Sequence, residues 1–242
     1  MWPEIFSSGI LRAQARLSTG VRLAARNLLP VAGAVTLVAC AATATDPLAS
    51  TVWPLREPAR VGGLATEVVG NPTPAGPGSP TALTFDGVGD GLFVPAVPIA
   101  GWQAFTIEVH FKPDATGGEE QRFLHFEDEM KHRVLMEMRV RDGQWSLDTF
   151  LYQDAARKLT LLDRSKRHPT DQWYWVALVY DGTTMTHYVN GAPELMGSVE
   201  FPPMTAGRTS IGVRQNRVSW FKGAIAELRF TPAALPAEKL RH

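Results

Sequence analysis

Short hydrophobic runs alternate with turn dipeptides along much of the chain. In Phe105–Phe111, apolar residues occupy every second position and polar residues lie between them, as in a strand with one buried face. Asp142-Gly143 separates two such runs and predicts a tight β-hairpin. The pattern predicts about ten strands, at Ala82–Phe85, Leu92–Val94, Phe105–Phe111, Arg122–Glu127, Val134–Arg141, Trp145–Leu151, Trp173–Tyr180, Met185–Val189, Thr209–Val213 and Gly223–Phe230. No helix longer than two turns is indicated, which argues against a helical bundle or a parallel α/β fold.

Several of these segments carry recognisable motifs, namely Ala82–Gly87, Trp173–Gly182, Tyr188–Gly191, Thr209–Val213, Phe221–Phe230 and Ala233-Ala234-Leu235. In this order they resemble the motifs of laminin-G-like domains, which belong to the concanavalin A-like lectin/glucanase family. The resemblance implies an all-β fold, a two-sheet antiparallel jelly-roll β-sandwich over residues 81–235, followed by a C-terminal tail at 236–242. It also implies that a ligand would bind on the concave sheet or at the rim loops, but the fold alone does not select a function.

Residues 1–40 have the features of a secretory signal peptide. An Arg-rich segment with a single acid, Glu4, precedes an apolar run, Leu28–Ala39, which ends at Cys40. Leu37-Val38-Ala39-Cys40 resembles the lipobox of bacterial lipoproteins, and this resemblance implies cleavage before Cys40 and lipidation of its thiol. We therefore expect an exported protein that is lipid-anchored to the bacterial cell envelope, at the outer membrane or the cell surface. Secretion after signal cleavage is the alternative.

Other interpretations of the N-terminal segment stay open. Its arginines, serines and lack of acids also suit a mitochondrial transit peptide, and Cys40 could instead be a small buried hydrophobe. Initiation at Val21 would shorten the basic head, which is long for a signal peptide. Residues 41–80 contain many prolines, so we expect a largely irregular tether between the anchor and the domain.

Composition and charge narrow the class of protein. The chain is 45% hydrophobic and 20% charged, which suits a globular domain with a sizeable core. Its formal net charge is zero, so nucleic acid is not expected as a partner. Cys40 is the only cysteine, which excludes a disulfide within the domain.

Polar residues at alternating strand positions form the candidate binding face. If the strands that carry them are neighbours in a sheet, their side chains converge on one surface beside Trp145 or Trp220. Aromatic platforms with fixed polar groups suit sugars or acidic glycans, whereas alternating charge also marks the wet face of an ordinary antiparallel sheet. The candidates are Arg122, His125, Glu137, Arg139, Trp145, Asp148, His187, Arg214 and Asn216.

Catalysis is less favoured than binding. The sandwich glycosidases with this kind of fold carry carboxylates at a Glu-x-Asp-x-x-Glu spacing, and Glu127-Asp128-Glu129 is contiguous instead. We therefore assign no catalytic residue and expect a module that binds carbohydrate or another envelope or extracellular ligand. A glycan-cleaving hydrolase or lyase that uses Glu137, Asp148 or His125 is one alternative, and a protein-interaction subunit is another.

The resemblance also raises the prediction of a structural calcium ion, because laminin-G-like and lectin-like sandwiches frequently hold one. Asp86 and Asp90 lie close together in a Gly-rich loop and, with Glu227, are the candidate oxygen ligands. Alternatively, the two aspartates bond the backbone of their own turn. The six histidines show no zinc-ligand spacing.

Overall fold

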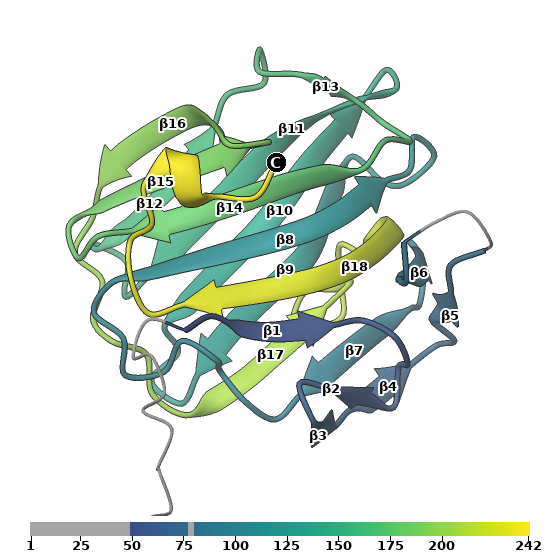
Figure 1. Cartoon of the computed structure of the whole chain (residues 1–242), viewed down its shortest axis with the longest axis horizontal. Helices are drawn as coiled ribbons and strands as arrows, with labels where there is room; N and C mark the ends of the chain where they lie inside the picture. Colours follow the sequence, from purple (N-terminus) through teal and green to yellow (C-terminus); the bar gives the residue numbers. More distant parts are fainter. Residues whose placement is uncertain (1–48, 77–79) are drawn as a thin grey trace, which may run out of the picture. The chain divides into compact units, whose positions relative to one another are not determined.

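A computed structural model describes residues 49–76 and 80–242, which form two large antiparallel sheets (Figure 1). The predicted signal peptide and Cys40 lie outside the described residues. In the first sheet, which we call the β8 sheet, the order is β16 (Ala192–Ser198), β15 (Thr184–Val189), β14 (Tyr174–Tyr180), β8 (Phe105–Pro113), β18 (Lys222–Thr231), β6 (Leu83–Asp86) and β5 (Thr73–Pro74), and β1 (Thr51–Pro54) also pairs with β18. The all-β sandwich predicted from the sequence is confirmed.

The second sheet, which we call the β10 sheet, carries the candidate site. Its order is β12 (Lys158–Leu162), β11 (Gln144–Tyr152), β10 (Arg133–Arg141), β9 (Glu120–Asp128), β17 (Gly207–Ile211), β7 (Gly91–Val94) and β4 (Glu67–Val69), and β13 (His168–Pro169) pairs with β11. A small hairpin of β2 (Arg60–Val61) and β3 (Leu64–Ala65) and the 3-10 turn Ala237–Lys239 complete the described elements. None of the helices in the described ranges is long and apolar enough to cross a membrane.

All ten predicted strands are present, and their ends differ from the predicted ones by two residues at most. The hairpin turns also follow the sequence, because Asp142 and Gly143 have φ values of 53° and 70°, and Asn190 and Gly191 have 47° and 74°. Two consecutive residues with positive φ make the tight turn whose twist matches that of the flanking strands. Local sequence therefore sets these two connections.

Residues 51–74 are not the irregular tether that their prolines suggested. They form β1 to β5, and three of their apolar side chains are buried in the core, namely Trp53, Leu55 and Val61. The ring of Trp53 packs edge-on against Phe230, with centroids 5.0 Å apart. Proline is compatible with this role because Pro54 ends β1, a strand that pairs on one side only. The domain therefore begins earlier than predicted.

The core fills the space between the two sheets with alternate side chains of each strand. Phe111 of the β8 sheet stacks on Phe123 of the β10 sheet at 4.7 Å, and Trp145 packs edge-on against Phe111 at 5.1 Å. The side chains between these positions point outward. On β9, β10 and β11 these outward positions hold charged residues that are nevertheless buried, including Arg122, Glu137 and Asp148. The candidate site lies on this outer face of the β10 sheet.

Candidate functional site

Five charged residues form an ion-pair lattice on the outer face of the β10 sheet. Strand register places Glu137 opposite both Asp148 on β11 and Arg122 on β9, and Arg139 opposite Glu120. Arg122 Nε lies 2.8 Å from Glu137 Oε1, and Arg139 Nη2 lies 2.5 Å from Asp148 Oδ2. Glu120 lies within 2.9 Å of Arg122 and 3.5 Å of Arg139. The lattice thus joins three neighbouring strands through charge.

The lattice leaves hydrogen-bonding capacity unused. Both carboxylate oxygens of Asp148, and Nε and Nη1 of Arg139, are buried and have no hydrogen-bond partner among the described residues. Arg139 and Asp148 therefore lie at ion-pair distance without hydrogen-bond geometry. Because an unmade hydrogen bond in a buried group is unfavourable, these atoms are suited to accept or donate to a ligand.

Burial changes the protonation of the two lattice carboxylates. Loss of solvent raises the pKa of Asp148 to about 7, with the charge of Glu137 adding to the rise and Arg139 opposing it. Burial likewise raises the pKa of Glu137, against the charge and hydrogen bond of Arg122. The lattice consequently becomes more positive as the pH falls through about 7, because Asp148 then takes up a proton.

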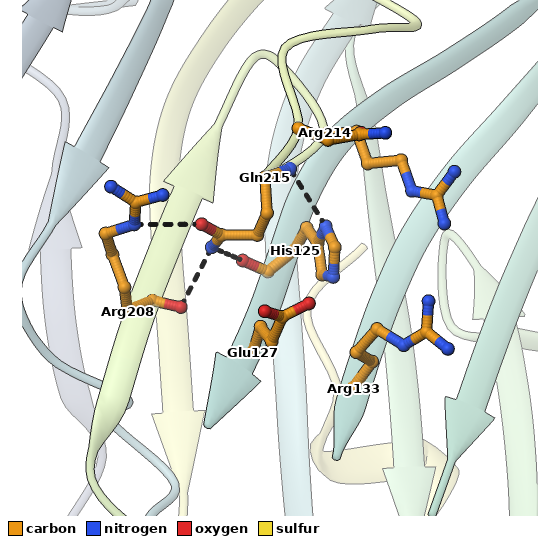
Figure 2. A pocket seen from close by; sticks show the side chains of 7 residues that line it. His125, Glu127, Arg133, Arg208, Arg214 and Gln215 are labelled. Carbon is orange, nitrogen blue, oxygen red and sulfur yellow. Dashed lines mark hydrogen bonds between the residues drawn. The ribbon is translucent and has the colours of Figure 1, made fainter. Parts of the chain in front are cut away.

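Next to the lattice, a hollow of about 270 Å³ opens around His125 (Figure 2). The backbone N–H of Gln215 donates to His125 Nδ1 at 3.1 Å. The side-chain amide of Gln215 donates to the carbonyls of His125 and Arg208 at 3.1 and 2.9 Å, and Arg208 Nε donates to its oxygen at 2.9 Å. Gln215 therefore locks the loop after β17 onto β9, and this contact fixes the orientation of the imidazole.

Two further hollows continue along the sheet from the one at His125. One, of about 170 Å³, lies over the ion-pair lattice and shares Arg214 with the hollow at His125; the other, of about 110 Å³, shares Arg139 with the lattice hollow. We call the three together the β10 groove. Eight arginines and three carboxylates contribute to its lining. The arginines are Arg122, Arg133, Arg139, Arg141, Arg164, Arg167, Arg208 and Arg214, and the carboxylates are Glu127, Glu137 and Asp148.

An aromatic surface lies at the groove. Phe150 lines the hollow over the lattice and is half-buried, and its ring lies 5.9 Å from that of Tyr152. The guanidinium of Arg133 lies over the Tyr152 ring at 3.9 Å, a cation–π contact. Apolar ring faces beside fixed polar groups are the usual composition of a small-molecule site.

Seven of the nine predicted site residues meet at the β10 groove. They are Arg122, His125, Glu137, Arg139, Asp148, Arg214 and Asn216. This places the residues together without testing that they bind a ligand.

The other two predicted residues do not lie on this face. Trp145 is 1% exposed and packs between the sheets. His187 is also in the interior, where Thr149 Oγ1 lies 3.0 Å from its Nδ1, and burial lowers its pKa to about 4. Strand alternation explains both placements, because each residue shares its side with core residues such as Leu147 and Met185.

Sequence reasoning missed several lining residues. Arg133, Arg208, Gln215 and Phe150 line the groove, as do Ser146, Arg164 and Arg167. Phe150 could have been found, because it alternates with Asp148 on the same strand. Gln215 and Arg208 had no such signal, since they come next to β9 only through the pairing of β17 with β9.

Of the predicted calcium ligands, Asp86 and Asp90 share one turn, whereas Glu227 does not form a group with them. Asp86 Oδ1 accepts the backbone N–H groups of Val88, Gly89 and Asp90, and the two oxygens of Asp90 accept those of Asn71 and Asp86.

Glu227 is on β18, where it pairs with Arg229 at 3.2 Å. Within the described ranges, no three His, Cys, Asp or Glu residues form a metal-binding group. The structure thus gives these aspartates the turn-forming role, and calcium binding stays a prediction from the sequence.

Two stacked antiparallel sheets with a polar groove on one outer face define a lectin-like β-sandwich. The chain belongs to the concanavalin A-like lectin/glucanases superfamily, because the model of one of its families matches residues 86–241. No curated protein matches the chain.

Several solved structures share this fold. One is domain 4 of AbnA, a GH43 extracellular arabinanase from Geobacillus stearothermophilus, which was solved in complex with arabinotriose. It is 20% identical to this chain, with a TM-score of 0.56. The match covers 74% of this chain and 87% of that one. The binding domain of botulinum neurotoxin serotype D is 14% identical, with a TM-score of 0.59, covering 79% of this chain and 50% of that one.

The binding domain of Paraclostridial Mosquitocidal Protein 1 is 12% identical, with a TM-score of 0.59 and coverages of 78% and 50%. The chain thus spans about half the length of the two toxin binding domains. These TM-scores establish a shared fold.

Proposed function

We propose that this protein is an exported, lipid-anchored module that binds a glycan along the β10 groove. The observation that carries the proposal is the convergence of three hollows on one outer face, with a half-buried aromatic ring and with buried polar atoms that have no partner among residues 49–76 and 80–242. Sugars are bound by such combinations of hydrogen-bonding groups and ring faces. The arabinotriose complex of the arabinanase domain supports carbohydrate as the ligand class.

The groove favours binding over cleavage. Its two central carboxylates each lie at ion-pair distance from an arginine, Glu137 from Arg122 and Asp148 from Arg139, so a cation balances the charge of each. His125 accepts the N–H of Gln215 at Nδ1, which occupies the one lone pair that a neutral imidazole could use to take a proton. We therefore propose that these residues position a ligand.

The first test concerns Phe150. We expect Phe150→Ala to weaken glycan binding by about tenfold, because it removes the ring face that would contact a sugar. The measurement is the dissociation constant of the full chain for the best ligand found on a glycan panel, by calorimetry, together with an assay for released reducing ends and unsaturated uronates.

The matched control for Phe150 is Tyr188→Ala, which removes a half-buried aromatic ring from the β8 sheet. Equal losses in the two variants, or a panel without any ligand, would contradict the proposed function. Released products would instead show an enzyme.

A second test concerns the proposed anchor. We expect the wild-type chain expressed in bacteria to incorporate radiolabelled palmitate and to fractionate with membranes, since two or more acyl chains anchor a protein stably. The Cys40→Ser variant should lose the label completely and leave the membrane fraction. A palmitate label that persists in Cys40→Ser would place the lipid elsewhere, and a wild type without label would disprove the anchor.

A further inference from the structure

His125 presents a buried hydrogen-bond donor to the hollow that surrounds it. Its Nδ1 accepts the N–H of Gln215, so the proton of the neutral ring is on Nε2. Nε2 has no hydrogen-bond partner in the described part of the chain, although the residue is only 1% exposed. In Figure 2 this nitrogen points away from Gln215, toward the side on which Glu127 and Arg133 lie. A donor held in this way requires an acceptor.

The same hollow has an excess of positive charge. None of the ion pairs within residues 49–76 and 80–242 involves Arg133 or Arg214, both of which line it. The single carboxylate in the lining, Glu127, is paired with Lys131 at 3.0 Å. The cation–π contact with Tyr152 holds the Arg133 guanidinium in place from one face. Two arginines are thus available to an anion.

We propose that the hollow around His125 binds the carboxylate of an acidic sugar, with His125 Nε2–H and the guanidiniums of Arg133 and Arg214 as donors. The inference rests on the proposed function, because the sugar ring would lie in the adjoining hollow beside Phe150, which shares Arg214. A planar carboxylate accepts two parallel hydrogen bonds from an arginine fork. A neutral sugar would leave both arginines without a counter-charge.

The surroundings keep His125 in the required form. Burial, reinforced by the charges of Arg214, Arg133 and Arg122, lowers the pKa of His125 to about 3. The ring is therefore neutral at physiological pH and donates from Nε2 without adding a charge of its own. A carboxylate bound beside it would favour the protonated ring and raise this pKa.

The test compares carboxylated, sulfated and neutral polymers. With the full chain, we expect polygalacturonate, alginate or hyaluronan to bind at least about tenfold more tightly than dextran. Arg214→Gln should weaken binding of the carboxylated polymers by about tenfold, because it removes one of the two guanidiniums that would pair with the carboxylate. The control is Arg157→Gln, an exposed arginine outside the groove lining, which should change the affinity by less than about twofold.

A second readout follows the imidazole itself. Addition of D-glucuronate should shift the Nε2–H resonance of His125 in nitrogen-15 spectra, D-glucose should not, and Arg214→Gln should suppress the shift. This signal reports contact at the hollow, which a merely structural role for Arg214 would not change.

Several results would overturn the assignment while leaving the proposed function intact. They are equal binding of dextran and the carboxylated polymers, binding of dextran sulfate without the carboxylated polymers, or equal losses in Arg214→Gln and Arg157→Gln. If the chain binds none of these polymers and no member of a wider glycan panel, the proposed function is contradicted as well.

Discussion

Replacing Trp53 with alanine should lower the free energy of unfolding by about 3–5 kcal/mol, the range for removing a large aromatic side chain from a core. Trp53 is 4% exposed and packs edge-on against Phe230 of β18. The deletion leaves a cavity that its neighbours on β1 and β18 can fill only in part. Urea unfolding of the full chain, followed by circular dichroism, measures the change.

A neighbour on the same strand provides the matched control. Val52 is 37% exposed, so Val52→Ala should change the free energy of unfolding by no more than about 0.5 kcal/mol. If Trp53→Ala is as mild as Val52→Ala, then residues 51–54 do not belong to the core and the segment is a tether after all.

The example of Trp53 shows where sequence reasoning on the fold reached its limit. Strict alternation predicted β8 and β10, and turn dipeptides predicted the two tight hairpins, because both signals are local. The strands before Thr81 carry no such pattern: β1 to β5 are two to four residues long and include prolines. The place of β1 comes from pairing with β18, far along the chain, which no local pattern could indicate.

The residues of the candidate site also fall into those that local alternation predicts and those that only long-range strand pairing brings together. Alternation correctly placed Glu137, Arg139 and Asp148 on one face, since strands adjacent in sequence also pair in space. The same alternation puts Trp145 on the opposite side of β11, so the prediction of Trp145 as a platform on this face was wrong. The approach of Gln215 to His125 could not be read in this way, because β17 and β9 pair across a long stretch of chain.

The second large effect concerns the ion-pair lattice. Arg139→Met should lower the free energy of unfolding by about 3–5 kcal/mol above pH 7, because it leaves the buried Asp148 without its cation. Glu137 retains Arg122, so the loss falls mainly on Asp148. Arg141→Met, on the same strand, is the control: this side chain is 73% exposed, and its removal should cost no more than about 0.5 kcal/mol.

The loss of stability in Arg139→Met should grow as the pH rises. The folded-state pKa of Asp148, about 7, is above its ordinary value of 3.8, so the folded protein binds more protons than the unfolded chain between these values. The contribution of Asp148 to the free energy of unfolding is therefore complete below about pH 4, and this contribution is lost as the pH rises through about 7. Without Arg139 the pKa rises further, so the penalty should be small near pH 5 and largest near pH 8.

The double variant Arg139→Met/Asp148→Asn isolates the cause. An asparagine cannot ionise, so this variant should recover most of the stability that Arg139→Met loses near pH 8 and should show a flatter pH profile than wild type. Thermal unfolding at several pH values measures both effects. A loss in Arg139→Met that is the same at pH 5 and pH 8, or that Asp148→Asn does not recover, would show that Asp148 is not the group whose charge Arg139 balances.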